Sequence, residues 1–157
     1  MDIGLLMEPV DIEKYDFIRL NMKERWVVLM RAGDPLAQKE TVTPKDLVEH
    51  PLIIPRRPSV RNEVLNWFGG SPRDLKIRFT HNLTTNGALM VRQGLGYALT
   101  IEGAIPFWDE HKLIYRPLSP EMSGSSVLAW KRQQPFSLAA TKFIGHLRCF
   151  FSGNYEK

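Results

Sequence analysis

The chain has 157 residues, a length that fits one ordinary domain or two small lobes. Hydrophobic residues make up 43% of the chain and charged residues 24%, a balance that excludes an intrinsically disordered protein. The net charge is +4, but the basic residues are scattered among acidic ones, so we do not expect this chain itself to bind DNA.

The sequence predicts a cytoplasmic chain without membrane contact. No apolar run approaches the roughly 18 residues that indicate a membrane span. The N-terminus, MDIGLLMEPVD, has neither a basic segment nor a small-residue cleavage site, so we expect no secretory signal. The lone cysteine, Cys149, cannot form an internal disulfide, and its place among aromatic residues predicts a buried structural thiol.

Hydrophobic periodicity predicts strands and helices that alternate along most of the chain. We expect strands at residues 2–7, 15–21, 25–33, 52–55, 75–81, 97–100, 113–118 and 125–132, the first of them buried. We expect helices at residues 44–49, 60–68, 84–93, 105–110 and 138–151. This alternation predicts an α/β fold with a mainly parallel sheet.

Capping side chains are predicted to start three of these helices. Thr43 has an acidic residue, Asp46, three positions later, which is a typical helix-start pattern. Ser59 precedes the second helix, and Thr84 or Thr85 starts the third.

The stretch Gly94-Leu95-Gly96 contains half of a dinucleotide-binding fingerprint. In that fingerprint the glycines follow a strand and open a helix. Here they close a predicted helix and precede a predicted strand. We therefore interpret them as a helix stop and a tight turn, not as a phosphate loop.

Polar residues follow three predicted strands, and they form the best candidate for a ligand site. Ligands of parallel sheets bind outside the carboxyl ends of the strands, where helix N-termini direct N–H donors. The candidate residues are Pro55, Arg56, Thr84, Thr85, Thr100 and Ile101. We hypothesise that these strand ends share one edge of the sheet and hold a polar or anionic ligand.

The same residues are also compatible with purely structural roles. The hydroxyls of Thr84 and Thr85 could do no more than cap a helix. Arg56 and Arg57 could pair with a carboxylate ligand or form a solvated surface pair.

Catalytic and metal-binding patterns are missing from the sequence. The four histidines, His50, His81, His111 and His146, are far apart and form no metal-ligand motif, so we interpret each as a surface or capping group. There is no GxSxG elbow and no local nucleophile–base pair. A carboxylate pair that only folding brings together stays open. We expect no metal, no cofactor and no enzymatic activity.

The order of several short motifs resembles the effector-binding domain of LysR-type transcriptional regulators. The motifs are DIGLL, RWVVLMRAGDPLA, VTPKDLVEHPLII, ALMVRQGLGYAL and LAWKRQQPFSLAATKFIGHL, and together they span essentially the whole chain. The spacing of DPLA after a strand, of DLVEHPLI, and of VxxGLG before a strand is the most specific part of the resemblance.

This resemblance implies a type II periplasmic-binding-protein-like fold, in which crossover strands join two Rossmann-like lobes and a small-molecule inducer binds between them. Residues 17–118 would form the crossovers and a complete second lobe. Residues 1–16 and 119–157 would form an incomplete first lobe, so that the chain is truncated at its N-terminus. The resemblance adds Glu8 to the candidate effector-binding residues, and Thr100 stands where the family commonly has proline.

The resemblance also implies partners. We expect a small-molecule effector that is anionic if the arginines contact it, a homodimer or higher oligomer, and contact with DNA only through a helix-turn-helix that this chain lacks. Exposed apolar surface from Ile3, Leu5, Trp130, Phe143 and Leu147 is expected to promote association. The alternatives are a solute-binding protein or a dehydratase-like enzyme of the same fold.

Overall fold

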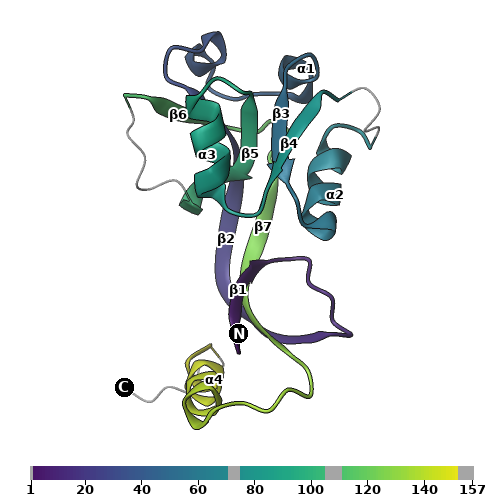
Figure 1. Cartoon of the computed structure of the whole chain (residues 1–157), viewed down its shortest axis with the longest axis vertical. Helices are drawn as coiled ribbons and strands as arrows, with labels where there is room; N and C mark the ends of the chain where they lie inside the picture. The colour runs from purple at the N-terminus through teal and green to yellow at the C-terminus, as the bar shows by residue number, and fades with distance from the viewer. Residues whose placement is uncertain (1, 71–74, 105–110, 152–157) are drawn as a thin grey trace. The chain divides into compact units, whose positions relative to one another are not determined.

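A computed structural model describes residues 2–70, 75–104 and 111–151 (Figure 1). Contacts divide the chain into two compact units, which we call unit 1 (Met1–Lys23 and Gly124–Lys157) and unit 2 (Glu24–Ser123). The chain therefore passes between the units twice. The helix expected at 105–110 falls outside the described residues.

The described elements follow the predicted order closely. The strands are β1 (Gly4–Met7), β2 (Tyr15–Arg31), β3 (Leu52–Pro55), β4 (Ile77–His81), β5 (Tyr97–Ile101), β6 (Leu113–Pro117) and β7 (Ser123–Lys131). The α-helices are α1 (Pro44–Leu47), α2 (Pro58–Trp67), α3 (Thr84–Arg92) and α4 (Leu138–Phe151). Short 3₁₀ helices, η1 (Pro35–Gln38) and η3 (Glu102–Ala104), complete the list.

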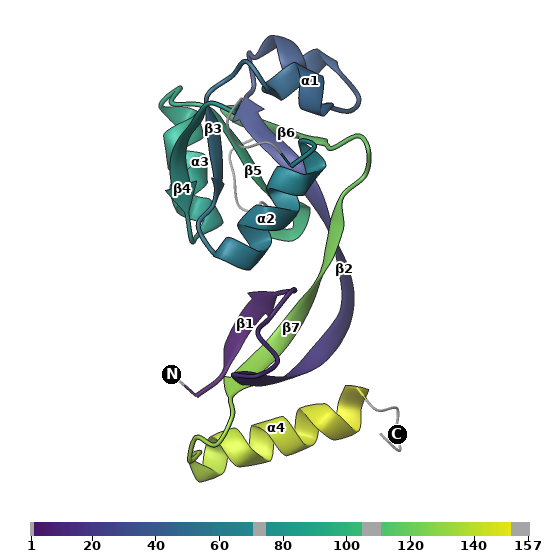
Figure 2. The same cartoon turned by 90° about the vertical axis from the view of Figure 1, so that its right-hand side faces the viewer.

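The sheet of unit 2 is mixed, so the prediction of a mainly parallel sheet was only partly right. β3 lies between β4 and β5 and runs parallel to both. β2 runs antiparallel to β5 and to β6. The connection β3-α2-β4 crosses the sheet in one direction, and the connection β4-α3-β5 crosses it in the opposite direction. Because both crossovers are right-handed, α2 and α3 cover opposite faces of the sheet (Figure 2).

The core of unit 2 explains why these segments form strands. The three apolar residues that open β3 are all buried, as expected for a strand covered on both faces. One buried cluster joins β2, β3, α3, β5 and β6 through Val27, Leu29, Ile53, Ala88, Val91, Ala98 and Leu113. Because β4 and β5 both pair in parallel with β3, the carboxyl ends of the three strands lie at one edge.

Unit 1 consists of β1, β7, the first part of β2 and α4, with β7 between β1 and β2. Three expectations were wrong here. β1 is not buried, because Leu5 is 66% exposed. Trp130, expected at the surface, is only 5% exposed, and Arg148 lies over its ring. Cys149 is exposed because it does not share the buried face of α4 with Ile144.

Two further local predictions were wrong. The strands expected at 15–21 and 25–33 form one strand, β2, because the polar stretch between them stays extended. Side-chain capping starts α1, where the Thr43 N–H donates to Asp46 Oδ2 at 2.8 Å, but it does not start α2 or α3. α2 begins earlier than expected, since Pro58 occupies its first turn.

Candidate functional site

The predicted ligand residues of unit 2 do lie at one edge of its sheet. Parallel pairing sets Pro55 beside His81, and the Arg56 N–H donates to the His81 carbonyl at 2.8 Å. β5 is parallel to β3, so Thr100 and Ile101 end at the same side. We call the set Pro55, Arg56, Thr84, Thr85, Thr100 and Ile101 the carboxyl edge.

A hydroxyl pair joins the start of α3 to the end of β5 within the carboxyl edge. The Oγ1 atoms of Thr84 and Thr100 are 2.8 Å apart and share one hydrogen bond. Thr100 is 3% exposed, whereas Thr84 is half-buried. The Thr100 hydroxyl is therefore satisfied within the protein, and Thr84 is the member of the pair that a ligand can reach.

The start of α3 leaves backbone donors open at the same edge. Leu83 occupies the N-cap position, and no side chain caps the helix. The amides of Thr84 and Thr85 stand in the first turn, where backbone N–H groups have no acceptor within the helix. Because the threonines are not used for capping, the helix N-terminus can donate to an external acceptor and favours negative charge.

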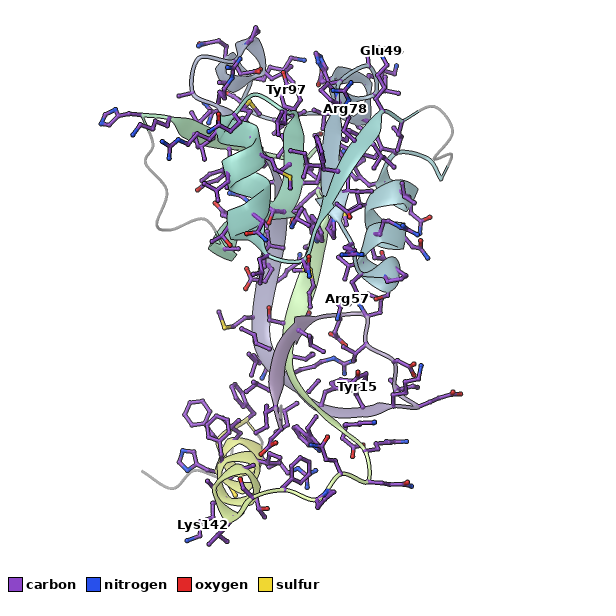
Figure 3. All side chains as sticks on the ribbon, in the orientation of Figure 1. Tyr15, Glu49, Arg57, Arg78, Tyr97 and Lys142 are labelled. Carbon is purple, nitrogen blue, oxygen red and sulfur yellow. The ribbon has the colours of Figure 1, made fainter. Side chains whose placement is uncertain are left out.

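Two arginines, Arg56 and Arg57, follow β3 beside the carboxyl edge. Arg56 is exposed, and Arg57 is half-buried, with its pKa lowered by burial (Figure 3). The neighbouring carboxylate of Glu102 is already paired, because Arg25 Nη2 lies 2.9 Å from Oε1 and the Tyr115 hydroxyl donates to the same oxygen at 3.0 Å. These contacts lower the pKa of Glu102, and the hydrogen bonds from Arg25 are the largest cause.

Sequence reasoning missed His81, which was assigned to the surface. The side chain is 7% exposed, and its Nε2 donates to the Leu99 carbonyl at 3.2 Å. Its Nδ1 is buried without a hydrogen-bond partner among the described residues. Burial lowers the pKa of His81, although the backbone carbonyls of Leu99 and Leu83 act in the opposite direction. Burial therefore favours the neutral form of the ring, and His81 pairs with Pro55 at the carboxyl edge.

A signal for His81 was present in the sequence. In a strand, residues two apart share one face, which groups His81 with Ile77 and Phe79. Gly87 of α3 packs on the ring, since a Cβ at that position would lie 3.3 Å from it. The phase alone was a weak signal, because Phe79 on the same face is 36% exposed, and the contact with Gly87 appears only in the fold.

Glu8, the remaining predicted site residue, belongs to unit 1. Its carboxylate is paired with Arg19, whose Nη2 lies 2.9 Å from Oε1 and whose Nε lies 3.1 Å from each oxygen. A ligand would have to compete with this bidentate pair for Glu8.

The turn at Gly94-Leu95-Gly96 is a helix stop, as predicted. Gly94 has φ +74°, and the Leu95 N–H donates to the Met90 carbonyl at 3.1 Å, which closes the end of α3. Gly96 has φ +153°, and a Cβ there would lie 2.3 Å from the Pro51 carbonyl oxygen. These glycines thus serve the turn and the close approach to Pro51.

The described residues also bear on metal binding and membrane insertion. No three His, Cys, Asp or Glu side chains among them are grouped so that they could hold a metal ion. No helix in the described part of the chain has the length and apolar character needed to cross a membrane.

Comparison with known proteins identifies relatives. The family model described as the LysR substrate binding domain matches residues 1–152. The uncharacterized HTH-type transcriptional regulator YvbU of Bacillus subtilis (strain 168) is 31% identical over 148 residues, which cover 92% of this chain and 48% of that protein. The chain thus spans about half the length of this relative.

Solved structures share the fold. The C-terminal domain of a probable LysR family transcriptional regulator from Rhodococcus sp. RHA1 has a TM-score of 0.73 at 21% identity, covering 94% of this chain and 74% of that one. The Synechocystis PCC6803 CcmR regulatory domain, solved in complex with 2-PG, has a TM-score of 0.72 at 17% identity, covering 93% and 71%. These matches confirm the predicted α/β, type II periplasmic-binding-protein-like fold.

Proposed function

The chain belongs to the LysR substrate-binding domain family, and on that premise we propose that it senses a small-molecule effector for a bacterial transcription regulator. We place the carboxyl edge of unit 2 in the effector site. The observation that carries this proposal is the Thr84–Thr100 hydroxyl pair beside the uncapped first turn of α3. A ligand site requires polar groups that converge at strand ends and whose hydrogen-bonding capacity the protein does not use up.

The donors at the carboxyl edge favour an effector with a carboxylate or phosphate group. The amides of Thr84 and Thr85 can each donate to an oxygen, and the Thr84 hydroxyl lies beside them. Arg56 is exposed and can supply a charge-assisted hydrogen bond. The neighbouring Glu102 is already paired with Arg25 and so repels an anion less than a free carboxylate would.

A regulatory domain of the same fold supports a small-molecule ligand. The CcmR regulatory domain was solved in complex with 2-PG, so a domain of this fold holds a small molecule. The YvbU protein is named as an HTH-type transcriptional regulator. We therefore propose a binding role rather than a catalytic one, with DNA contacted by another part of a longer protein and with self-association of that protein.

The proposed regulation is a population shift. An effector changes the activity of a regulator only if it binds two conformations with different affinities. Contacts at the carboxyl edge that form in one conformation alone would supply that difference. Effector binding would then change the affinity for DNA, and DNA binding would change the affinity for the effector by the same factor.

The experiment has two stages. The protein is first screened for thermal stabilisation by a panel of small carboxylates and phosphates that includes 2-PG. A compound that stabilises it is then used in a transcription reporter assay with the longer regulator that carries this domain. We expect Arg56→Ala and Thr85→Ala each to raise the half-maximal effector concentration, Arg56→Ala by about tenfold, because a charge-assisted hydrogen bond is lost.

Two matched variants control for general loss of charge or hydroxyl groups. Arg92→Ala removes an exposed arginine from the opposite end of α3, and Thr141→Ala removes an exposed threonine from α4. Both should leave the dose response unchanged. An unchanged response in Arg56→Ala and Thr85→Ala, with all four proteins folded, would remove the carboxyl edge from the effector site.

A further inference from the structure

β1 is the outer strand of the sheet in unit 1. It pairs antiparallel with β7, from Gly4 opposite Ala129 to Met7 opposite Ser126. β1 stands last in the strand order, so no strand of the described residues pairs with its other side (Figure 2). A strand in this position offers backbone N–H and C=O groups to a further strand.

The register with β7 shows which backbone groups of β1 face the open side. The Glu8 N–H donates to the Ser125 carbonyl at 2.9 Å, in line with the register of β1, so these residues form a hydrogen-bonded pair. Hydrogen-bonded and non-hydrogen-bonded pairs alternate along antiparallel strands. Leu6 and Gly4 therefore bond to β7, whereas the N–H and C=O groups of Leu5 point to the open side.

The side chains of β1 leave this edge unprotected. Leu5 is 66% exposed, and it lies opposite the half-buried Leu128 on the same face of the sheet. The strand has the sequence GLLM, without a charged side chain, and its pairing with β7 contains no bulge. Proteins usually protect an open edge with lysine, proline or a bulge. This edge is therefore suited to pairing with another strand.

Charges at the two ends of β1 favour a second, antiparallel β1 as that strand. Asp2, before the strand, forms no hydrogen bond or ion pair with the other described residues. Beyond the other end, Arg19 holds Glu8 through Nε and Nη2, and the arginine side chain is 63% exposed. An antiparallel partner brings its Asp2 to this arginine, and the contact forms twice. A parallel partner in register would place Asp2 beside Asp2 instead.

We propose that β1 pairs with β1 of a second copy of this chain about a two-fold axis at Leu5. The N–H and C=O groups of the two Leu5 residues exchange hydrogen bonds. Leu5 and Leu128 of both copies then form one apolar row across the joined sheet. The pairing goes beyond the proposed effector function, since it uses no residue of unit 2, and it assigns a surface to the self-association proposed above.

The short length of β1 sets the strength of this contact. A four-residue strand buries much less than the roughly 800 Å² per partner of a standard interface. We therefore expect a weak and reversible dimer, with a dissociation constant on the order of 100 µM.

The first test is sedimentation velocity of the full chain, without effector, at concentrations from about 5 to 500 µM. The wild-type protein should pass from monomer to dimer over this range. Leu5→Lys should raise the dissociation constant at least tenfold, because it places a charge at the centre of the strand pair. Ile12→Lys is the matched control, because Ile12 is 64% exposed in the same unit but lies outside β1. Its dissociation constant should be unchanged.

Two further measurements test the geometry of the pair. The Leu5 N–H should become more protected from hydrogen exchange as the protein concentration rises. The Leu6 N–H should be protected at every concentration, because it bonds to β7. Asp2→Asn should weaken the dimer severalfold through loss of the contact with Arg19, whereas Glu13→Gln, at an exposed carboxylate outside β1, should not.

Several results would overturn the proposal. One is a chain that stays monomeric up to about 500 µM. Another is a dimer that Leu5→Lys leaves intact, or that Leu5→Lys and Ile12→Lys weaken equally. A dimer without added protection of the Leu5 N–H would use another surface, which strikes this pairing and leaves the proposed self-association standing. In the longer regulator, protection of Leu5 at every dilution would show that another segment of the same chain occupies the edge, against a second copy.

Discussion

The carboxyl edge of unit 2 lies opposite the edge of the same sheet where β3 and β5 begin, which we call the amino edge. The two edges have opposite chemistry. At the carboxyl edge α3 begins, and its first-turn amides stand beside the Thr84–Thr100 hydroxyl pair. At the amino edge α3 ends, and its last turn is closed by Gly94 next to the Arg31 guanidinium. One helix thus supplies backbone donors at one end, whereas a side chain must supply positive charge at the other.

The two edges also differ in what holds their local structure in place. The backbone at the amino edge is constrained by a close approach that only glycine permits. The carboxyl edge is held by the hydrogen bond between the Thr84 and Thr100 side chains and by the buried ring of His81. Variants at the two edges should therefore fail for different reasons.

The largest effect is expected from Gly96→Ala at the amino edge. A methyl group there would lie 2.3 Å from the Pro51 carbonyl oxygen, and φ is +153°, so both a clash and backbone strain result. We expect the free energy of unfolding to fall by about 3 kcal/mol or more in urea denaturation. Gly33→Ala is the control, because a Cβ at Gly33 meets nothing within 4 Å. Equal stability of the two variants would contradict the tight turn.

The next effect concerns the hydroxyl pair at the carboxyl edge. Thr84→Val leaves the Thr100 hydroxyl buried without its partner, which costs about 1–3 kcal/mol of unfolding free energy. Thr85→Val, at the adjacent exposed position, should cost much less. The double variant Thr84→Val/Thr100→Val should recover part of the loss, since no unpaired hydroxyl remains. Additive losses would show that the two hydroxyls are not coupled.

A smaller effect is expected at the amino edge from Tyr97→Phe. This change removes the hydroxyl that donates to Asp34 Oδ2 at 2.7 Å in a half-buried site, and we expect a loss of about 1 kcal/mol of unfolding free energy. Tyr115→Phe, which removes the donor to Glu102 near the carboxyl edge, is a useful comparison. No loss in Tyr97→Phe would mean that the Asp34 carboxylate is held by the Leu36 N–H alone.

The smallest effect is a pH dependence from His81. Burial lowers its pKa in the folded protein from the ordinary value of 6.5. As the pH falls below about 6.5, the unfolded chain binds a proton at His81 that the folded protein does not bind, so stability is lost until the folded pKa is passed. Unfolding measured between about pH 8 and pH 5 should show this loss, and His81→Asn should reduce it. A wild-type slope in His81→Asn would exclude His81 as the cause.

The sequence predicted the elements that carry strong periodic or turn signals. The run LIIP became β3 at the predicted residues, and the Thr43–Asp46 pattern became a capped helix. Gly94 and Gly96 follow a predicted helix and precede a predicted strand, and the interpretation as a helix stop fits that order. These features depend on residues close in sequence, which is why they were accessible.

Features that depend on distant residues were harder to predict. The burial of His81 arises from Gly87 and Leu99, which lie on other elements. The Thr84–Thr100 hydrogen bond joins residues 16 positions apart, although both had been assigned to the same edge. The hydrogen bond between Tyr97 and Asp34 at the amino edge was not foreseen at all, because the two residues come from separate segments without a shared motif.

The central claim is that the effector contacts the carboxyl edge of unit 2. The most direct test is amide chemical-shift mapping of the labelled protein with the compound that stabilises it most in the thermal screen. The account predicts saturable shifts at the amides of Arg56, Thr84 and Thr85, with Gly94 and Gly96 unchanged. Shifts that leave Arg56, Thr84 and Thr85 unmoved at saturation would contradict it.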